Sequence, residues 1–183
     1  MSLVVIDILR LVLDTIGALL GVTLLLRAYM NWVGMPSRNP LQQFAIALTD
    51  WIVRPLRRVL PAMGRWDTAS LVAAYLVAVL MMLLTFILLG AGPSSWPLVE
   101  TLYSALILVL RWCIYTVLFL TVVHVVLSWV NPYAPVAPAI ATLVRPFLAP
   151  FQRIIPTIGN IDFSPLVLLL IVNILLLILN RAT

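Results

Sequence analysis

The chain has 183 residues, of which 64% are hydrophobic and only 9% charged, and its formal net charge at pH 7 is +5. This composition excludes an ordinary water-soluble domain, which needs far more polar surface. The basic side chains are arginines that are not gathered with aromatic residues into one patch, so we expect no direct binding of nucleic acid.

Four apolar runs are long enough to cross a bilayer as helices, which takes roughly 20 residues. They lie at 11–33, 68–89, 108–130 and 164–180. The sequence therefore predicts an all-α membrane protein with four transmembrane helices. In the first run, Gly17-x-x-x-Gly21 would let another helix approach closely.

An internal repeat organises these spans. Residues 54–71, RPLRRVLPAMGRWDTASL, align without gaps on residues 149–166, APFQRIIPTIGNIDFSPL, and Trp32-Val33 corresponds upstream to Trp129-Val130. We therefore divide the chain into a first repeat at 1–90, an outer turn at 91–97 and a second repeat at 98–183. The identical pairs in the aligned segments are Pro55/Pro150, Arg58/Arg153, Pro61/Pro156, Gly64/Gly159, Asp67/Asp162 and Leu71/Leu166.

The orientation of the repeats follows from the number of spans. Each repeat crosses twice, so both enter the membrane in the same direction and should form two parallel, pseudo-symmetric helical hairpins. Most of the arginines lie in the connections within the two hairpins, whereas the outer turn contains none. The positive-inside rule then places these connections in the cytoplasm and both termini outside.

Each connection contains an interfacial segment, at 41–61 and at 136–156. The apolar residues of 41–53 follow a helical period, which predicts an amphipathic helix too short to cross the bilayer. We expect its equivalent at 138–148 to be broken by Pro146. A bent Pro-x-x-Arg-x-x-Pro element follows in each repeat, because Pro cannot donate a backbone hydrogen bond. Its lipid- or partner-facing residues would be Pro55, Arg58, Pro61, Pro150, Arg153 and Pro156.

Ionisable residues inside the first and third spans are candidates for function, because charge in a membrane is costly. The repeat alignment places Arg27 opposite His124, and the two residues could line a polar path between the repeats. The favoured alternative is that Arg27 anchors to lipid phosphates while His124 hydrogen-bonds to a neighbouring helix. Asp14 and Arg111 are a candidate inter-repeat ion pair, although Arg10 is a competing partner for Asp14.

Two carboxylates precede the second and fourth spans. Asp67 and Asp162 could coordinate a cation or a partner, but we favour helix-start carboxylates stabilised by the helix dipole and by Arg58 or Arg153. In the second repeat we expect Ser164 to be the N-cap. No catalytic constellation or metal-ligand spacing is present, so we expect no enzyme, no metal and no cofactor.

The combined pattern resembles the YggT family. It consists of Trp-Val at the end of a span, Pro-x-x-Arg-x-x-Pro-x-x-Gly-x-x-Asp, and a helix beginning Ser-Pro. Asn39-Pro40 and RPLRRVLPAMG fit the first repeat, and SWVNP and RIIPTIGNIDFSP fit the second, so the resemblance covers 11–180 in the two-repeat form of proteobacteria. The chain departs from the family at Asp67, which is followed by Thr-Ala-Ser rather than Phe-Ser-Pro.

The resemblance implies a multi-pass protein of the bacterial inner membrane, and the positive-inside rule then places both termini in the periplasm. Family members are linked to osmotic stress tolerance and potassium homeostasis, and other relatives to division, nucleoid distribution and cytochrome b6 haem attachment. Our leading hypothesis is a non-enzymatic scaffold or assembly factor that contacts anionic inner-leaflet headgroups and other membrane or cytoplasmic proteins, with a homo-oligomer left open. The alternative is an ion channel or small-solute permease with a path between the repeats.

Overall fold

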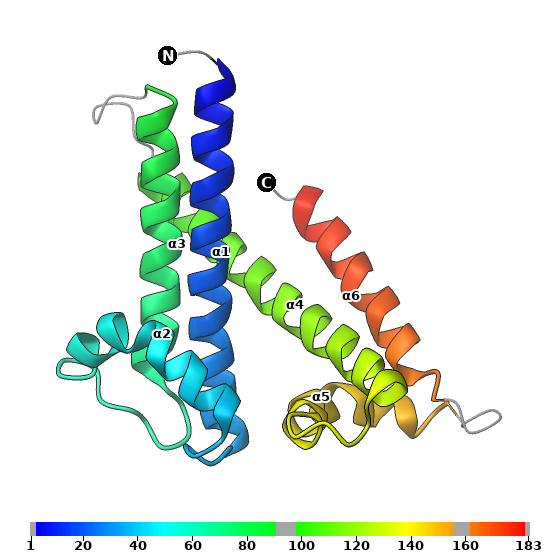
Figure 1. The fold of residues 1–183 in the computed structure, drawn as a ribbon. Coiled ribbons are helices and arrows are strands. Elements are labelled where there is room, and N and C mark those ends of the chain that lie inside the picture. The colour runs from blue at the N-terminus through cyan, green and yellow to red at the C-terminus, as the bar shows by residue number, and fades with distance from the viewer. Residues whose placement is uncertain (1–2, 91–97, 156–161, 182–183) are drawn as a thin grey trace.

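The computed structural model describes residues 3–90, 98–155 and 162–181. Within these ranges the chain forms six α-helices and no β-strand (Figure 1). Four of the helices, α1, α3, α4 and α6, are long and apolar enough to cross a membrane, which confirms the predicted all-α fold with four spans. In chain order the helices are α1 (Leu3–Val33), α2 (Pro40–Leu56), α3 (Thr68–Leu88), α4 (Leu98–Val130), α5 (Ala137–Gln152) and α6 (Ser164–Arg181).

The helices α1 and α4 are longer than the predicted spans at 11–33 and 108–130. Both begin earlier in the chain, at the ends that point away from α2 and α5. Their 31 and 33 residues rise about 46 and 50 Å, whereas the hydrocarbon core of a bilayer is about 30 Å thick. Figure 1 shows α4 inclined to α1 and α3. Inclination of this kind is how an over-long span fits a bilayer.

The end of α1 is set by a glycine that adopts a left-handed conformation. Gly34 has a φ of 80°, and its N–H donates to the carbonyl of Asn31 at 3.1 Å. The N–H of Met35 donates to the carbonyl of Met30 at 2.9 Å. This pair of bonds is a Schellman motif, which closes the helix and turns the chain toward α2.

The spans pack in pairs, and the two short helices lie at the same end of them (Figure 1). In the first half of the molecule, α1 packs along α3, and in the second half α4 packs along α6. Contacts of α4 with both α1 and α3 join the halves. The Tyr29 hydroxyl on α1 adds a bond to the Leu143 carbonyl on α5 at 2.7 Å. The short helices therefore belong to the same packed unit as the spans.

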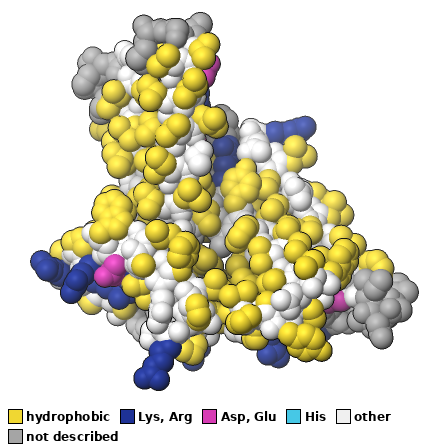
Figure 2. All heavy atoms as spheres, in the orientation of Figure 1, with side chains coloured by type: hydrophobic (Ala, Val, Ile, Leu, Met, Phe, Trp, Pro, Cys, Tyr) yellow, Lys and Arg dark blue, Asp and Glu magenta, His cyan; other side chains and the backbone are white. Residues whose placement is uncertain are grey.

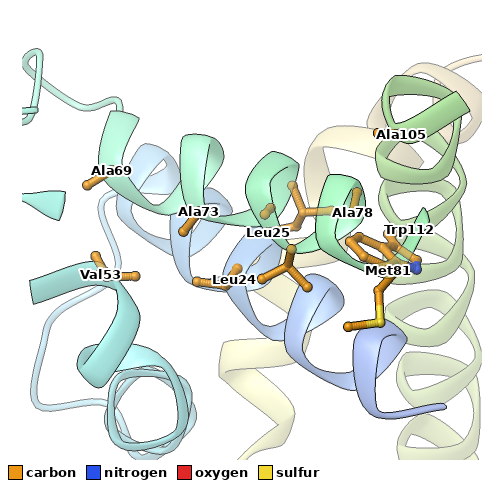
Figure 3. Close-up of a cluster of buried hydrophobic side chains, with 11 residues drawn as sticks. Leu24, Leu25, Val53, Ala69, Ala73, Ala78, Met81, Ala105 and Trp112 are labelled. Carbon is orange, nitrogen blue, oxygen red and sulfur yellow. The ribbon is translucent and has the colours of Figure 1, made fainter. Parts of the chain in front are cut away.

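Small side chains let α1 and α3 approach closely. Ala69, Ala73 and Ala78 on α3 are fully buried; Ala73 and Ala78 lie beside Leu24 and Leu25 of α1, and Ala69 lies toward Val53 of α2 (Figure 3). Lipid tails are as apolar as leucine, so helices in a membrane gain little by hiding apolar surface from each other. Close van der Waals contact across small residues stabilises such an interface instead.

The two glycines singled out in α1 are both sites of close approach. A Cβ at Gly17 would lie 2.6 Å from the sulfur of Met81 on α3. A Cβ at Gly21 would collide with the indole ring of Trp112 on α4, whose side chain is almost completely buried. Gly21 therefore makes room for the residue that packs the second half against the first.

The break predicted at Pro146 is wrong. Helix α5 runs without interruption from Ala137 to Gln152 and contains both Pro146 and Pro150. Each proline leaves only one carbonyl, four residues earlier, without its helical donor. These carbonyls belong to Thr142 and Pro146, which are both exposed, so their surroundings rather than the helix can satisfy them.

Replacing Gly21 with Ala should destabilise the protein by about 1–3 kcal/mol, because the new methyl group forces the Trp112 ring to move. The matched variant Gly17→Ala should cost less, because the flexible Met81 side chain can shift. Thermal unfolding in detergent, followed by size-exclusion chromatography, measures both. A Gly21→Ala protein as stable as the wild type would contradict this packing.

Candidate functional site

Arg27 is the centre of a charge network in the first half. Its side chain is only 3% exposed although it lies within a span. Its Nη1 donates to Oγ1 of Thr49 at 3.0 Å, and its Nη2 donates to Oδ1 of Asp50 at 3.1 Å, both on α2. Its Nε lies 3.7 Å from Oδ2 of Asp67, at the start of α3. One guanidinium group therefore connects α1, α2 and α3.

Asp67 is the second buried member of the network, at 1% exposure. Its Oδ2 accepts from Nη2 of Arg57 at 2.7 Å and from the Ser70 hydroxyl at 2.8 Å, while Oδ1 faces the Ser70 N–H at the first turn of α3. Burial alone would raise the pKa of Asp67. The hydrogen bonds from Arg57 and Ser70, with the charges of Arg57 and Arg27, outweigh burial and hold this pKa below its ordinary value of 3.8. The carboxylate is therefore ionised at neutral pH.

The charges in this network balance. Arg27 and Arg57 supply two positive charges, and Asp50 and Asp67 supply two negative ones. A buried charge is tolerated only when it is paired and hydrogen-bonded, and removing one partner strands the other. The network therefore holds three helices in one arrangement, with the carboxylate of Asp67 also acting as the N-cap of α3.

Helix α2 turns its polar side toward this network. Gln42 and Thr49 are buried, whereas Phe44 and Trp51 are 63% and 67% exposed. The period of this helix predicted that it has a polar and an apolar side. It did not predict which side packs against the rest of the protein. The buried face also includes Ala45 and Val53. Exposed large apolar residues together with buried Gln42 and Thr49 suit a helix covered by lipid rather than by water.

The second half contains a less charged version of the same contact. Nε2 of Gln152 donates to Oδ2 of Asp162 at 2.8 Å, and the N–H of Ser164 donates to Oδ1 at 2.8 Å. In the alignment of the two repeats, Gln152 corresponds to Arg57 and Asp162 corresponds to Asp67. Burial raises the pKa of Asp162, but the hydrogen bonds and the nearby charge of His124 outweigh it, and the net shift is downward. The Asp162 carboxylate, rather than the Ser164 hydroxyl, caps α6.

The structure places the two residues of the suggested polar path in different surroundings. Arg27 is almost completely buried and is bonded to Thr49 and Asp50 within the first half. His124, which is half-buried, lines a separate cavity of about 270 Å³ with Ser128 of α4 and Ala141 of α5. The groove that does lie between the halves, about 400 Å³ in volume, has an apolar lining that includes neither residue.

The suggested inter-repeat ion pair is not among the ion pairs of the described residues. Asp14 lies 3.8 Å from Arg10, one turn earlier on α1, and both side chains are exposed. Nη2 of Arg111 donates to the carbonyl of Leu179 on α6 at 3.5 Å. In the structure, Asp14 is therefore paired with Arg10, the competing partner on its own helix.

The interfacial residues lie at the end of the molecule that carries α2 and α5. Arg153 is the C-cap of α5. Arg58 lies in the turn after α2, and its N–H donates to the Pro55 carbonyl at 3.2 Å. Neither arginine is the partner of a helix-start carboxylate, because Arg57 and Gln152 take that place. Pro156 lies outside the described residues. The exposed members are Pro55, Arg58, Pro61, Pro150 and Arg153.

The partners of the buried charges, Thr49, Asp50 and Arg57, were not predicted from the sequence. One feature of the sequence could have indicated the pairing of Arg27 with Asp67. The predicted spans place these two opposite charges near the same membrane surface. The polar side of 41–53 was a second signal. Arg57 could not be preferred over Arg58 from spacing alone, since both precede Asp67 by about ten residues.

Arg27→Leu should destabilise the protein by about 3–5 kcal/mol, because it leaves Asp50 and the buried Asp67 with fewer positive partners. Arg27→Lys should recover only part of this loss, since an ammonium cannot reproduce the forked contacts. The control is Arg10→Gln, which removes an exposed pair worth under about 1 kcal/mol. Thermal unfolding in detergent distinguishes them, and equal stability of the Arg27→Leu and Arg10→Gln proteins would contradict a structural role for Arg27.

Known proteins are similar in sequence to this chain over nearly its whole length. The model of the CCB3/YggT family matches residues 6–88 and 103–183. A protein of Escherichia coli (strain K12), named uncharacterized protein YggT, is 33% identical over 168 residues, which cover 91% of this chain and 86% of the relative. An uncharacterized protein of Pseudomonas aeruginosa is 33% identical over 173 residues, covering 93% and 87%. No solved structure matches the chain. With both sequence repeats matched, this chain belongs to the CCB3/YggT family.

Proposed function

We propose that this chain is a non-enzymatic inner-membrane scaffold that binds anionic lipid headgroups and partner proteins at the end formed by α2 and α5. Its influence on envelope, osmotic and ion homeostasis would follow from this assembly role. The observation that carries the proposal is the distribution of charge. Buried charges are paired inside the protein, whereas Figure 2 shows exposed arginines gathered mainly along the end where α2 and α5 lie.

Exposed arginines and aromatic residues occur together at this end. The aromatic residues include Trp51 and Trp66, at 67% and 56% exposure, and Trp129 and Tyr133, at 77% and 93%. Tryptophan and tyrosine favour the headgroup level of a bilayer, and arginines near an anionic leaflet are attracted to its phosphates. The exposed arginines at this end are Arg38, Arg54, Arg57, Arg58, Arg65, Arg145 and Arg153, of which Arg57 is paired with Asp67.

The same observations favour a binding role over a transport role. An ion path needs polar groups that can exchange their partners along a wet route. Arg27, the charged residue buried in α1, instead has fixed partners on α2 and α3. The groove between the halves offers hydrocarbon surface. These features support a protein that presents its cationic end to lipids and proteins.

The double variant Arg58→Gln/Arg153→Gln should lose affinity for anionic lipid, by about 1 kcal/mol for each arginine and so by roughly 30-fold in total. Native mass spectrometry with added phosphatidylglycerol measures this loss, and phosphatidylcholine gives the charge-independent background. The matched control is Arg10→Gln/Arg181→Gln, which removes the same charge from exposed residues of two spans.

The control should retain phosphatidylglycerol like the wild type. Unchanged retention by the Arg58→Gln/Arg153→Gln protein, or an equal loss in both double variants, would count against a headgroup site formed by these turns.

A further inference from the structure

The groove between the two halves extends along the spans. Its wall on α1 runs from Leu25 to Trp32, and its wall on α4 runs from Cys113 to Leu120. Each wall covers seven helical steps, or about 10 Å at the rise of an α-helix. The groove, of about 400 Å³, therefore reaches from the end near α5 into the region of the hydrocarbon core.

The lining of the groove offers almost no polar group to a ligand. The Tyr29 hydroxyl is already bonded to the Leu143 carbonyl at 2.7 Å. The Thr116 hydroxyl donates to the Trp112 carbonyl within α4, also at 2.7 Å. The remaining walls are apolar or aromatic, with the Cys113 side chain at the deep end. A molecule that fills this groove must therefore be a hydrocarbon along its length.

One end of the groove has the features of the headgroup level. The rings of Trp32 and Trp66 lie 6.1 Å apart there, and both line the groove. The turn that carries Trp66 is held to α1 by a bond from Nδ2 of Asn31 to the carbonyl of Arg65 at 3.1 Å. Arg65 is exposed beside this end. Tryptophans at an interface with an adjacent arginine suit a lipid phosphate.

The nearest carboxylate does not oppose an anion at this end. Asp67 follows Trp66 in the chain, but it is 1% exposed and its charge is neutralised by Arg57 and Arg27. On the opposite wall, Phe147 of α5 contributes an apolar ring. The exposed charge beside this end is therefore the positive charge of Arg65.

We infer that this groove binds one acyl chain of an anionic phospholipid, with the lipid phosphate beside Arg65 at the tryptophan end. This inference rests on the proposed lipid-binding role and adds a specific site between the halves. A tail gains little by leaving other tails for an apolar wall, so selectivity comes from the shape of the groove and from the arginine. The bound chain would fill the space between α1 and α4 and hold the two halves in register.

A photoreactive phosphatidylglycerol with a diazirine on its acyl chain tests the site in the wild-type protein. In vesicles of phosphatidylglycerol and phosphatidylcholine, we expect crosslinks concentrated on the two groove walls, 25–32 and 113–120. Crosslinks spread evenly over lipid-facing positions such as Leu106 and Leu110 would overturn the inference. In a separate reaction, joining of two copies through Cys113 by a bifunctional maleimide would also overturn it, since a second copy would then fill the groove.

Thr116→Phe should abolish the wall crosslinks, because a phenyl ring fills the groove. The matched control Leu110→Phe adds the same ring to an exposed position of the same helix that does not line the groove, and it should retain the wall crosslinks.

Arg65→Gln should lower the preference for phosphatidylglycerol over phosphatidylcholine by about fivefold. Crosslinking of the Thr116→Phe protein equal to that of the control would reject the site. The wild-type map decides the question if Thr116→Phe does not fold.

The outcomes separate this site from the proposed function. Loss of crosslinks in Thr116→Phe, with unchanged lipid retention in Arg58→Gln/Arg153→Gln, would keep the groove site and reject the headgroup role of the two turns. The reverse result would keep the proposed function and reject the groove site.

Discussion

A buried arginine in a membrane-spanning helix must find its counter-charges inside the protein, and Arg27 imposes this requirement on the whole first half. Its partners come from α2 and from the start of α3, so three helices must meet at one guanidinium. This requirement explains why α2 turns Thr49 inward and exposes Trp51. It also explains why α2 is part of the packed unit rather than an appended surface helix.

This arrangement separates two uses of charge. Within the first half, charge holds helices together, because the buried side chains of Arg27 and Asp67 pair with each other and with Asp50 and Arg57. At the end with α2 and α5, exposed arginines lie near aromatic residues and can meet phosphate groups. The groove between the halves connects these two regions, since it begins beside Trp66 and ends near Cys113. A scaffold of this kind needs a rigid interior and an adaptable, cationic surface.

Much of the fold was predictable because bilayer thickness and cap chemistry act locally. Apolar length predicted the four spans, and Asp67 was expected to start a helix. The partners of Arg27 were not predictable, because those contacts link residues 22, 23 and 40 positions apart and depend on how α2 is rotated about its axis. Periodicity divides a helix into two faces, but in lipid either face can turn toward the protein. The continuity of α5 through Pro146 depended on exposed carbonyls that spacing does not reveal.

The most direct test of whether the intramembrane charge is structural is a potassium flux measurement on the purified protein in liposomes. The account predicts a potassium flux no faster than that of empty liposomes. Valinomycin, added at the end, shows that the vesicles are sealed and that the dye used to report the flux responds. The same result is expected for Arg27→Leu and His124→Leu wherever those proteins remain folded. A protein-dependent potassium flux that either substitution changes would contradict the account and would assign these residues to an ion path.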